Sequence, residues 1–302
     1  MTALGLNFAR IVHQMKASRK FLSDTHVKVM SHGGFPYEAF NGKAQINPWS
    51  IMHMMEFSRN ASFNKFSPTD HCFLEFDKLY QNYLVFIASA TTKVYPKLYD
   101  YSVTKGPLEI HVELDNVGKT SFGLKTSIFQ EATDTPLCES FVQSVFVDLA
   151  KRKPNPPPDW WLEKYKQGLE GQATLRVPRH VLPQDGILWN YQMKVAASEI
   201  DTYWHTNWSQ YVKFMFNAYV DFSAGTHSSG NLAAAFQKSK EFSVLYMQES
   251  NLGDSLDVQL WRDKHNPNLF KFQFLKQADV ICESQLELYP HDPSEDVHGF
   301  AL

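Results

Sequence analysis

The chain has 302 residues, of which 43% are hydrophobic and 20% are charged, which is the composition of a folded globular protein. That length allows one large domain or two domains of about 150 residues each. The net charge of -3 at pH 7 gives no electrostatic reason to expect a nucleic-acid partner. No apolar run reaches the roughly 18 residues that a transmembrane helix needs.

The three cysteines, Cys72, Cys138 and Cys282, form no CxxC pair and cannot all pair with one another. This usage favours free thiols in a reducing compartment and predicts a cytoplasmic protein. The sequence also has no GxSxG turn, no glycine-rich phosphate loop, no HExxH motif and no Cys/His metal spacing. We therefore expect no cofactor and no metal ion.

Residues 1–23 carry four basic side chains, no acidic one, and apolar residues at helical spacing. Two interpretations remain open for this segment. A mitochondrial presequence has such a composition, and it makes a mitochondrial location the alternative to the cytoplasm. A basic amphipathic helix docked on the domain has the same composition, and no secretory signal is recognised.

The first half then predicts one extended segment, one helix and a series of strands. The extended segment turns at Gly33 to Pro36, and the helix covers Ile46 to Phe63, with Pro48 at its favoured first position. Four alternating or β-branched runs follow, separated by Gly, Asn and Pro, at 83–95, 107–117, 119–130 and 137–149.

A proline-rich segment separates the two halves. Four prolines fall within residues 154–158, where they block both helix and ladder pairing, so a stiff extended connector is expected. A short helix near Trp160 to Gln167 follows. The sequence predicts a first domain at 1–153, a linker at 154–171 and a second domain at 172–302.

The second half repeats this order of elements. An extended segment and a helix precede four strand-like runs, at 241–250, 254–263, 268–277 and 279–289. Trp49-Ser50 matches Trp208-Ser209 at an offset of 159 (208 minus 49). At this offset Gly42, Ala44 and Ile46 stand opposite Asp201, Tyr203 and His205, so the first copy is expected to lack the polar residues.

The most informative stretch begins at Asp201 and enters the second helix. From His205 onward apolar residues recur at the three-and-four spacing of a helix, and Thr206 or Asn207 can cap it. A helix start offers free N–H groups and a partial positive charge, which can polarise a carbonyl oxygen.

This stretch resembles the signature of the hotdog-fold acyl thioesterases, on the residues Asp201, His205, Asn207 and Tyr211. Trp204 stands where that family usually has Gly or Gln, and the sequence also departs from the signature at Tyr203 and Trp208. The resemblance implies an α+β fold of two tandem hotdog domains, each a long helix wrapped by a curved antiparallel sheet, forming a pseudo-dimer. It implies a degenerate site in the first domain and a working one in the second.

A second resemblance falls on the pair Glu249-Ser250, which is similar to the Glu-Cys pair of the plant acyl-ACP thioesterases. Because Ser250 stands in place of the cysteine, a thiol nucleophile is not expected. Glu249 remains a candidate base or a partner of His205.

The resemblance implies an enzyme that hydrolyses acyl-CoA or acyl carrier protein thioesters to free acid and thiol, and a homodimer is left open. For this reaction we expect Asp201 or Glu249 to activate water, His205 to hold the carbonyl or relay the proton, and N–H groups near Asn207 to receive the oxyanion. The predicted catalytic residues are Asp201, His205, Asn207 and Glu249, and the predicted substrate-binding residues are Tyr203, Trp208, Tyr211 and Ser250.

Two alternatives remain. One is a non-catalytic module that binds acyl thioesters or lipids. The other is a hotdog hydratase or dehydratase, but that branch uses Asn-Pro-x-His, whereas Trp49-Ser50 follows Asn47-Pro48 here.

Overall fold

The computed structural model describes residues 14, 17–67, 69–167, 169, 177–183, 186–226 and 235–291. Contacts between residues divide the chain into two units. The first unit comprises Met1–Phe35 and Met52–Val177, and the second comprises Pro36–Ile51 and Pro178–Leu302. The predicted first domain included residues 36–51, which here group with the second unit. The indole of Trp49 in this segment lies 5.8 Å from the ring of Phe216.

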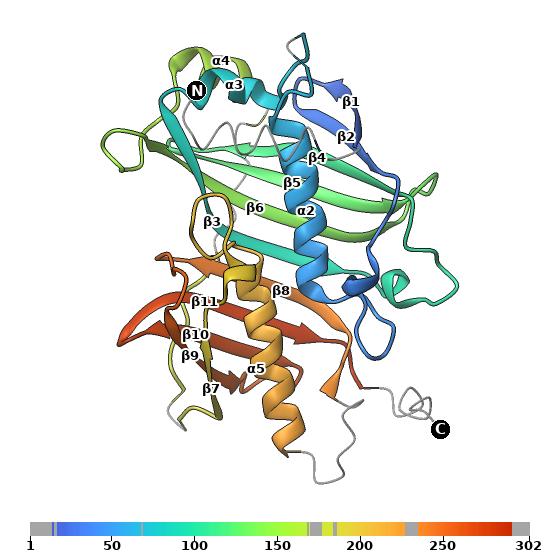
Figure 1. Ribbon diagram of the computed structural model, residues 1–302, viewed down its shortest axis with the longest axis vertical. Coiled ribbons are helices and arrows are strands. Elements are labelled where there is room, and N and C mark those ends of the chain that lie inside the picture. Colours follow the sequence, from blue (N-terminus) through green and yellow to red (C-terminus); the bar gives the residue numbers. More distant parts are fainter. Residues whose placement is uncertain are drawn as a thin grey trace. The chain divides into compact units, whose positions relative to one another are not determined.

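Alternating burial builds the sheet of the first unit. In β4 (Leu108–Val117) every second residue is buried, as expected of a strand with one face on the core. Its neighbours are all antiparallel, in the order β1-β2-β4-β5-β6-β3 (Figure 1). The other strands are β1 (Ser18–Ser23), β2 (His26–Ser31), β3 (Tyr83–Val94), β5 (Ser121–Gln130) and β6 (Pro136–Asp148).

One long helix, α2 (Pro48–Phe63), crosses the strands of this unit in Figure 1. It begins at Pro48. Proline is favoured there because the N–H that it lacks would have no acceptor within the helix at that position. An aromatic cluster covers its end, and Phe63 and Phe76 stack with ring centroids 4.1 Å apart. The shorter helices of the first unit are η2 (Phe73–Glu75), α3 (Phe76–Leu79), η3 (Pro96–Tyr99) and α4 (Asp159–Tyr165), whereas η1 (Tyr37–Ala39) belongs to the second unit.

In the second unit, five antiparallel strands lie in the order β8-β11-β10-β9-β7. Its long helix, α5 (Gln210–Thr226), contacts β7, β9 and β11 and buries ten of its residues. The remaining elements are β7 (Trp189–Lys194), η4 (Ala197–Glu199), β8 (Ser239–Tyr246), β9 (Ser255–Arg262), β10 (Leu269–Lys276) and β11 (Asp279–Leu288).

The strands of the two units share one topology. Read from β2 in the first unit and from β7 in the second, the strands follow the order first, third, fourth, fifth, second. Within the described residues, the first unit adds one strand, β1, which pairs with β2. The repeated order of elements predicted from the sequence is therefore present in the structure.

Two predicted segments differ from the structure. The second helix begins at Gln210 instead of following His205 directly, because Thr206 forms an isolated bridge with Ile200 and residues 208–209 form a turn. Ser18 to Ser23 form a strand, so the predicted N-terminal helix does not extend over them; most of residues 1–16 lie outside the described part.

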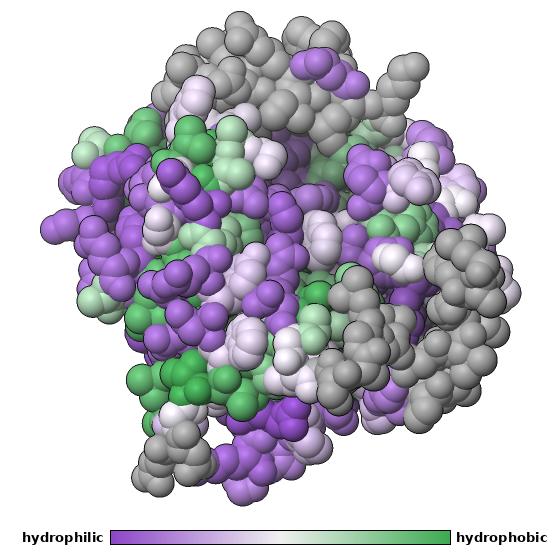
Figure 2. All heavy atoms as spheres, turned by 60° about the horizontal axis from the view of Figure 1, so that its bottom comes forward, coloured by the Kyte–Doolittle hydropathy of each residue, from purple (hydrophilic) through white to green (hydrophobic). Residues whose placement is uncertain are grey.

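Among the described residues, no helix is both long and apolar enough to cross a membrane. The face shown in Figure 2 is mostly hydrophilic, and its hydrophobic residues gather in small groups.

Candidate functional site

The loop that leads into α5 is a tight turn built around Asp201. The backbone N–H of Asp201 donates to the carbonyl of His205 at 3.0 Å, and that of Trp204 donates to the carbonyl of Asp201 at 3.0 Å. Oδ1 of Asp201 accepts from the backbone N–H of Tyr203 at 2.8 Å, which is the geometry of an Asx turn. The carboxylate thus shapes the turn that carries the imidazole.

Asn207 caps the start of α5. Its Oδ1 accepts from the backbone N–H of Ser209 at 2.9 Å and from the Ser209 hydroxyl at 2.6 Å. Its own N–H donates to the carbonyl of Glu199 at 2.8 Å. The backbone donors of Asn207 and Ser209, where the sequence placed an oxyanion site, are therefore already engaged. Since Oδ1 is held by Ser209, the Nδ2 amino group is the donor that this side chain can offer to a substrate.

The structure brings His205 and Glu249 together. Nδ1 of His205 lies 3.2 Å from Oε2 of Glu249, and the two side chains are 23% and 53% exposed. Glu249 follows β8, and its carbonyl accepts from Nζ of Lys276 at 3.1 Å. We assign the imidazole proton to Nδ1, because the carboxylate accepts it there, and this leaves the lone pair of Nε2 available for a reaction.

A buried chain of three hydroxyl groups fastens the loop to the segment after β8. Oγ of Ser250 lies 2.7 Å from Oγ1 of Thr206 and 2.9 Å from the phenol oxygen of Tyr211. The N–H of Thr206 also donates to the carbonyl of Ser250 at 2.8 Å. Burial raises the pKa of Tyr211 well above its usual range, so its phenol remains a neutral donor. Because Thr206 follows His205 and Ser250 follows Glu249, these bonds hold the pair in place.

The other predicted substrate residues lie around this loop. Trp208 is only 8% exposed, and its carbonyl accepts from the hydroxyl of Tyr246 at 2.8 Å. Tyr203 is half-buried. Beside it, Trp204 is 77% exposed and has a φ of 66°, in the left-handed region.

Sequence reasoning did not identify Glu199, which is buried under the loop. Its Oε2 accepts from the N–H of Ala196 at 2.8 Å, and its Oε1 pairs with Nζ of Lys213 at 3.1 Å. The carbonyl of Glu199 also accepts from Asn207. An acidic residue two positions before Asp201 was the only sequence signal of this support.

The first copy contains the same turn without the same side chains. The N–H of Asn41 donates to the carbonyl of Gln45 at 2.8 Å, and that of Lys43 donates to Oδ1 of Asn41 at 2.9 Å. The N–H of Asn47 donates to the carbonyl of Ala39 at 2.8 Å. These bonds repeat those of Asp201, Tyr203, His205, Asn207 and Glu199, 160 positions later (201 minus 41).

The predicted alignment of the copies was therefore wrong by one residue. Asn41, Lys43 and Gln45, and not Gly42, Ala44 and Ile46, stand opposite Asp201, Tyr203 and His205. The error arose from matching Trp49 with Trp208, whereas the hydrogen bonds match Pro48 with Trp208. The first copy still offers neither a carboxylate nor an imidazole at these three positions.

The supporting network also differs between the copies. The isolated bridges Phe40–Ile46 and Ile200–Thr206 make Ile46 the counterpart of Thr206. At the same offset, Ile51 is the counterpart of Tyr211. The register of the last strand pairs Val94 with Cys138 and Tyr246 with Cys282. Counted onward along the chain from these pairs, Lys97 and Leu98 in η3 correspond to Glu249 and Ser250. Buried hydroxyl groups of the second copy are thus buried aliphatic side chains in the first: Ile46, Ile51 and Leu98.

Known structures share this fold at low sequence identity. An acyl-ACP thioesterase from Bacteroides thetaiotaomicron superposes with a TM-score of 0.63 at 13% identity, covering 89% of this chain and 100% of its own. A 12:0-ACP thioesterase from Umbellularia californica gives a TM-score of 0.65 at 11% identity, with 91% and 98% covered. No protein-family model and no curated protein matches the chain. The chain therefore shares the fold of these two thioesterase structures.

Proposed function

We propose that this chain hydrolyses acyl thioesters to a free acid and a thiol. The observation that supports it best is the pair of Nδ1 of His205 and Oε2 of Glu249 at 3.2 Å, in which the imidazole is half-buried and the carboxylate is exposed. An imidazole whose Nδ1 is held by a carboxylate is a general base with its lone pair on Nε2. Such a base can activate water for attack on a thioester at neutral pH.

In the proposed reaction, Nε2 of His205 removes a proton from water while the water oxygen attacks the thioester carbonyl carbon. The carbonyl electron pair moves to oxygen, and Nδ2 of Asn207 donates a hydrogen bond to the resulting oxyanion. The carbon–sulfur bond then breaks, and the imidazolium returns its proton to the leaving thiolate. Glu249 stabilises the imidazolium between these steps.

Other residues near His205 have supporting roles in this proposal. Asp201 shapes the turn, and it is the alternative base that the sequence offers. Ser250 and Tyr211 hold the loop, because the hydroxyl of Ser250 is fully buried and hydrogen-bonded to two others. A covalent acyl group on Ser250 is not expected.

Tyr203 and Trp208 remain proposed contacts of the acyl thioester, whose carrier is either coenzyme A or acyl carrier protein. The pairing of the two units as a pseudo-dimer is part of the proposal, supported by their common topology. A location in a reducing compartment such as the cytoplasm is also proposed, because the cysteines are free and buried.

Release of free thiol from a panel of acyl-CoA and acyl carrier protein thioesters tests the proposal. His205→Gln is expected to lower kcat by about 100- to 10,000-fold, with a small change in KM. Glu249→Gln should lower kcat by a similar factor, and Asp201→Asn by much less. The control is His265→Gln, which changes an exposed imidazole elsewhere in the second unit.

Two outcomes would change this assignment. If Asp201→Asn abolished turnover and Glu249→Gln were mild, the base would be Asp201. If the wild-type chain bound a thioether analogue of acyl-CoA but released thiol from no substrate, the chain would be a non-catalytic binding module. Thermal unfolding of each variant separates lost chemistry from lost folding.

A further inference from the structure

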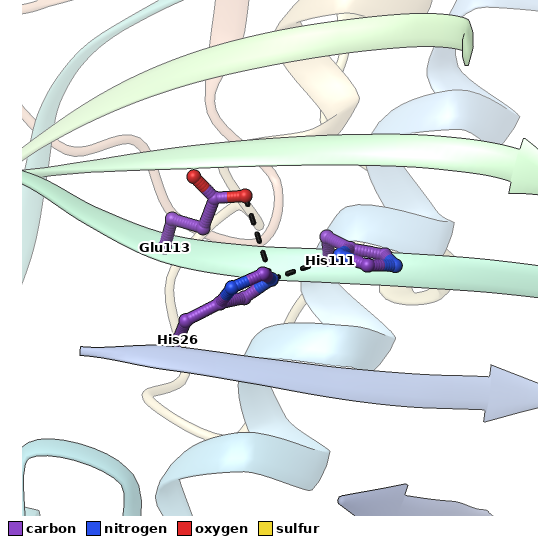
Figure 3. A group of neighbouring side chains, drawn as sticks. All are labelled: His26, His111 and Glu113. Atoms are coloured by element: carbon purple, nitrogen blue, oxygen red, sulfur yellow. Dashed lines mark hydrogen bonds and ion pairs between the residues drawn. The ribbon is translucent and has the colours of Figure 1, made fainter. Parts of the chain in front are cut away.

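A second group of functional side chains lies on the sheet of the first unit, away from the catalytic loop in sequence. His26 begins β2, and His111 and Glu113 lie on β4. His26 is directly opposite Glu113 in the strand register, and His111 is two residues from Glu113, so the pleat places all three on one face (Figure 3). Regular strands, and not a flexible loop, hold this group together.

The potential ligand atoms of the three side chains converge. Nε2 of His26 lies 2.8 Å from Nδ1 of His111 and 3.4 Å from Oε1 of Glu113. All three ligand atoms lie within 4.8 Å of one another. The side chains of His26, His111 and Glu113 are 28%, 20% and 41% exposed, so an ion can enter from solvent and keep bound water.

The outer partners orient the second imidazole. Nε2 of His111 lies 2.8 Å from Oε1 of Glu109, and Oε2 of Glu109 lies 3.0 Å from Nζ of Lys28. We assign the His111 proton to Nε2, because the carboxylate of Glu109 accepts it there. The lone pair of Nδ1 then points toward His26. A carboxylate behind a ligating histidine is the usual outer partner in metal sites.

The side chain of Glu113 lies opposite a lysine that pairs with another carboxylate. Lys125 is its register partner on β5. Nζ of Lys125 instead lies 2.7 Å from Oε1 of Glu139. Glu113 therefore offers a negative oxygen to the two imidazoles.

We propose that His26, His111 and Glu113 bind one divalent first-row transition ion, represented by Zn²⁺. Two imidazoles and one carboxylate are a donor set that such ions prefer, and water would complete the coordination. The ion takes the place of the proton that His26 and His111 share. A tetrahedral ion with metal–nitrogen bonds of about 2.0–2.1 Å separates its two nitrogens by about 3.3 Å, so the present 2.8 Å widens by a small side-chain rotation.

The site joins β2 to β4 across their ladder, so the bound ion is expected to stabilise the folded chain. This role does not depend on thioester hydrolysis. The site would persist in a chain without any activity, and His205→Gln is expected to leave its zinc affinity unchanged.

Zinc titration of the full chain, tag removed and stripped of metal, tests the proposal by competition with a chromophoric chelator. One Zn²⁺ per chain is expected. His26→Gln and Glu113→Gln should each weaken binding by about 100-fold or more, and Glu109→Gln by about 10- to 100-fold through its effect on His111. The matched control, His265→Gln, should bind zinc as the wild type does.

Thermal unfolding provides the second readout. Zn²⁺ should raise the Tm of the wild type and of His265→Gln, and it should not raise that of His26→Gln. Circular dichroism without zinc shows whether His26→Gln is folded, and Glu113→Gln serves if it is not. Equal zinc affinity in His26→Gln and His265→Gln would overturn the site and assign the binding to other groups.

Discussion

At the residue scale, Trp204 shows strain in the turn that precedes α5. Its φ of 66° lies in the left-handed region, which costs an L-residue roughly 1–2 kcal/mol. The resemblance to hotdog thioesterases places Gly or Gln at this position. Ala44, its counterpart in the first copy, has a φ of 55°. The turn itself, and not the side chain of Trp204, therefore demands this conformation.

Trp204→Gly is expected to maintain stability or to increase it by about 0.5 kcal/mol. Relief of the left-handed strain is partly offset by the greater flexibility of glycine in the unfolded chain. Trp204→Val, with a β-branched side chain, should instead cost about 1 kcal/mol or more. Urea denaturation measures both differences.

Trp160 is a suitable control, because it is 39% exposed and lies in the first turn of the helix α4. Trp160→Gly should destabilise by about 1 kcal/mol, as glycine does in a helix. An equal loss for Trp204→Gly and Trp160→Gly would show that the strain at the turn is absent.

The residues of the site were only partly predictable. Spacing indicated His205 and Glu249, since each belongs to a short motif. The buried bonds of Thr206 and Tyr211 with Ser250 were not predicted, because they join a loop to a strand end that is distant in sequence. The periodicity of apolar residues indicates which side chains are buried, but it does not indicate which buried hydroxyl groups form hydrogen bonds with one another.

At the element scale, one arginine of β1 terminates the helix α2. Nη1 of Arg19 donates to the carbonyls of Ala61, of Ser62 at 2.9 Å and of Asn64 at 2.6 Å. Nη2 pairs with Asp70, and the Arg19 side chain is 4% exposed. A cation at a helix C-terminus is favourable, and these carbonyls lack intrahelical donors.

Arg19→Met is expected to lower the free energy of unfolding by about 3 kcal/mol. Methionine fills most of the space, but the helix carbonyls and Asp70 lose their buried donor. The midpoint of urea denaturation measures the loss. The adjacent and exposed Lys20 provides the control, since Lys20→Met should change stability by less than about 0.5 kcal/mol. Equal midpoints for the two variants would contradict the capping role.

The same residue explains an error of sequence interpretation. Arg19 and Lys20 were grouped with the basic side chains of a presequence or an amphipathic helix. Composition cannot separate a buried arginine from a surface one, because its acceptors lie at a helix end more than 40 residues later in the chain. The long strands and α2 were predictable, since their periodicity is local.

At the scale of the whole molecule, duplication explains both the success and the limit of the sequence analysis. The repeated order of elements predicted two similar units, and their common strand order agrees. The offset between the copies was not predictable from the sequence. The identity of Trp49-Ser50 and Trp208-Ser209 suggested 159, whereas the hydrogen bonds of the two loops give 160. Only backbone hydrogen bonds revealed that Gln45 is the counterpart of His205.

The last prediction concerns how many acyl-thioester sites one chain has, and it depends on the proposed function. Gln45, Lys97 and Leu98 occupy the positions of His205, Glu249 and Ser250, so the first copy lacks both the imidazole–carboxylate pair and its hydroxyl support. Calorimetric titration with a thioether analogue of acyl-CoA should therefore give one site per chain. Gln45→His should leave this number at one and add no turnover, because Lys97 cannot accept the imidazole proton. Two equivalent sites in the wild type would show that the turn alone, without those side chains, binds the ligand.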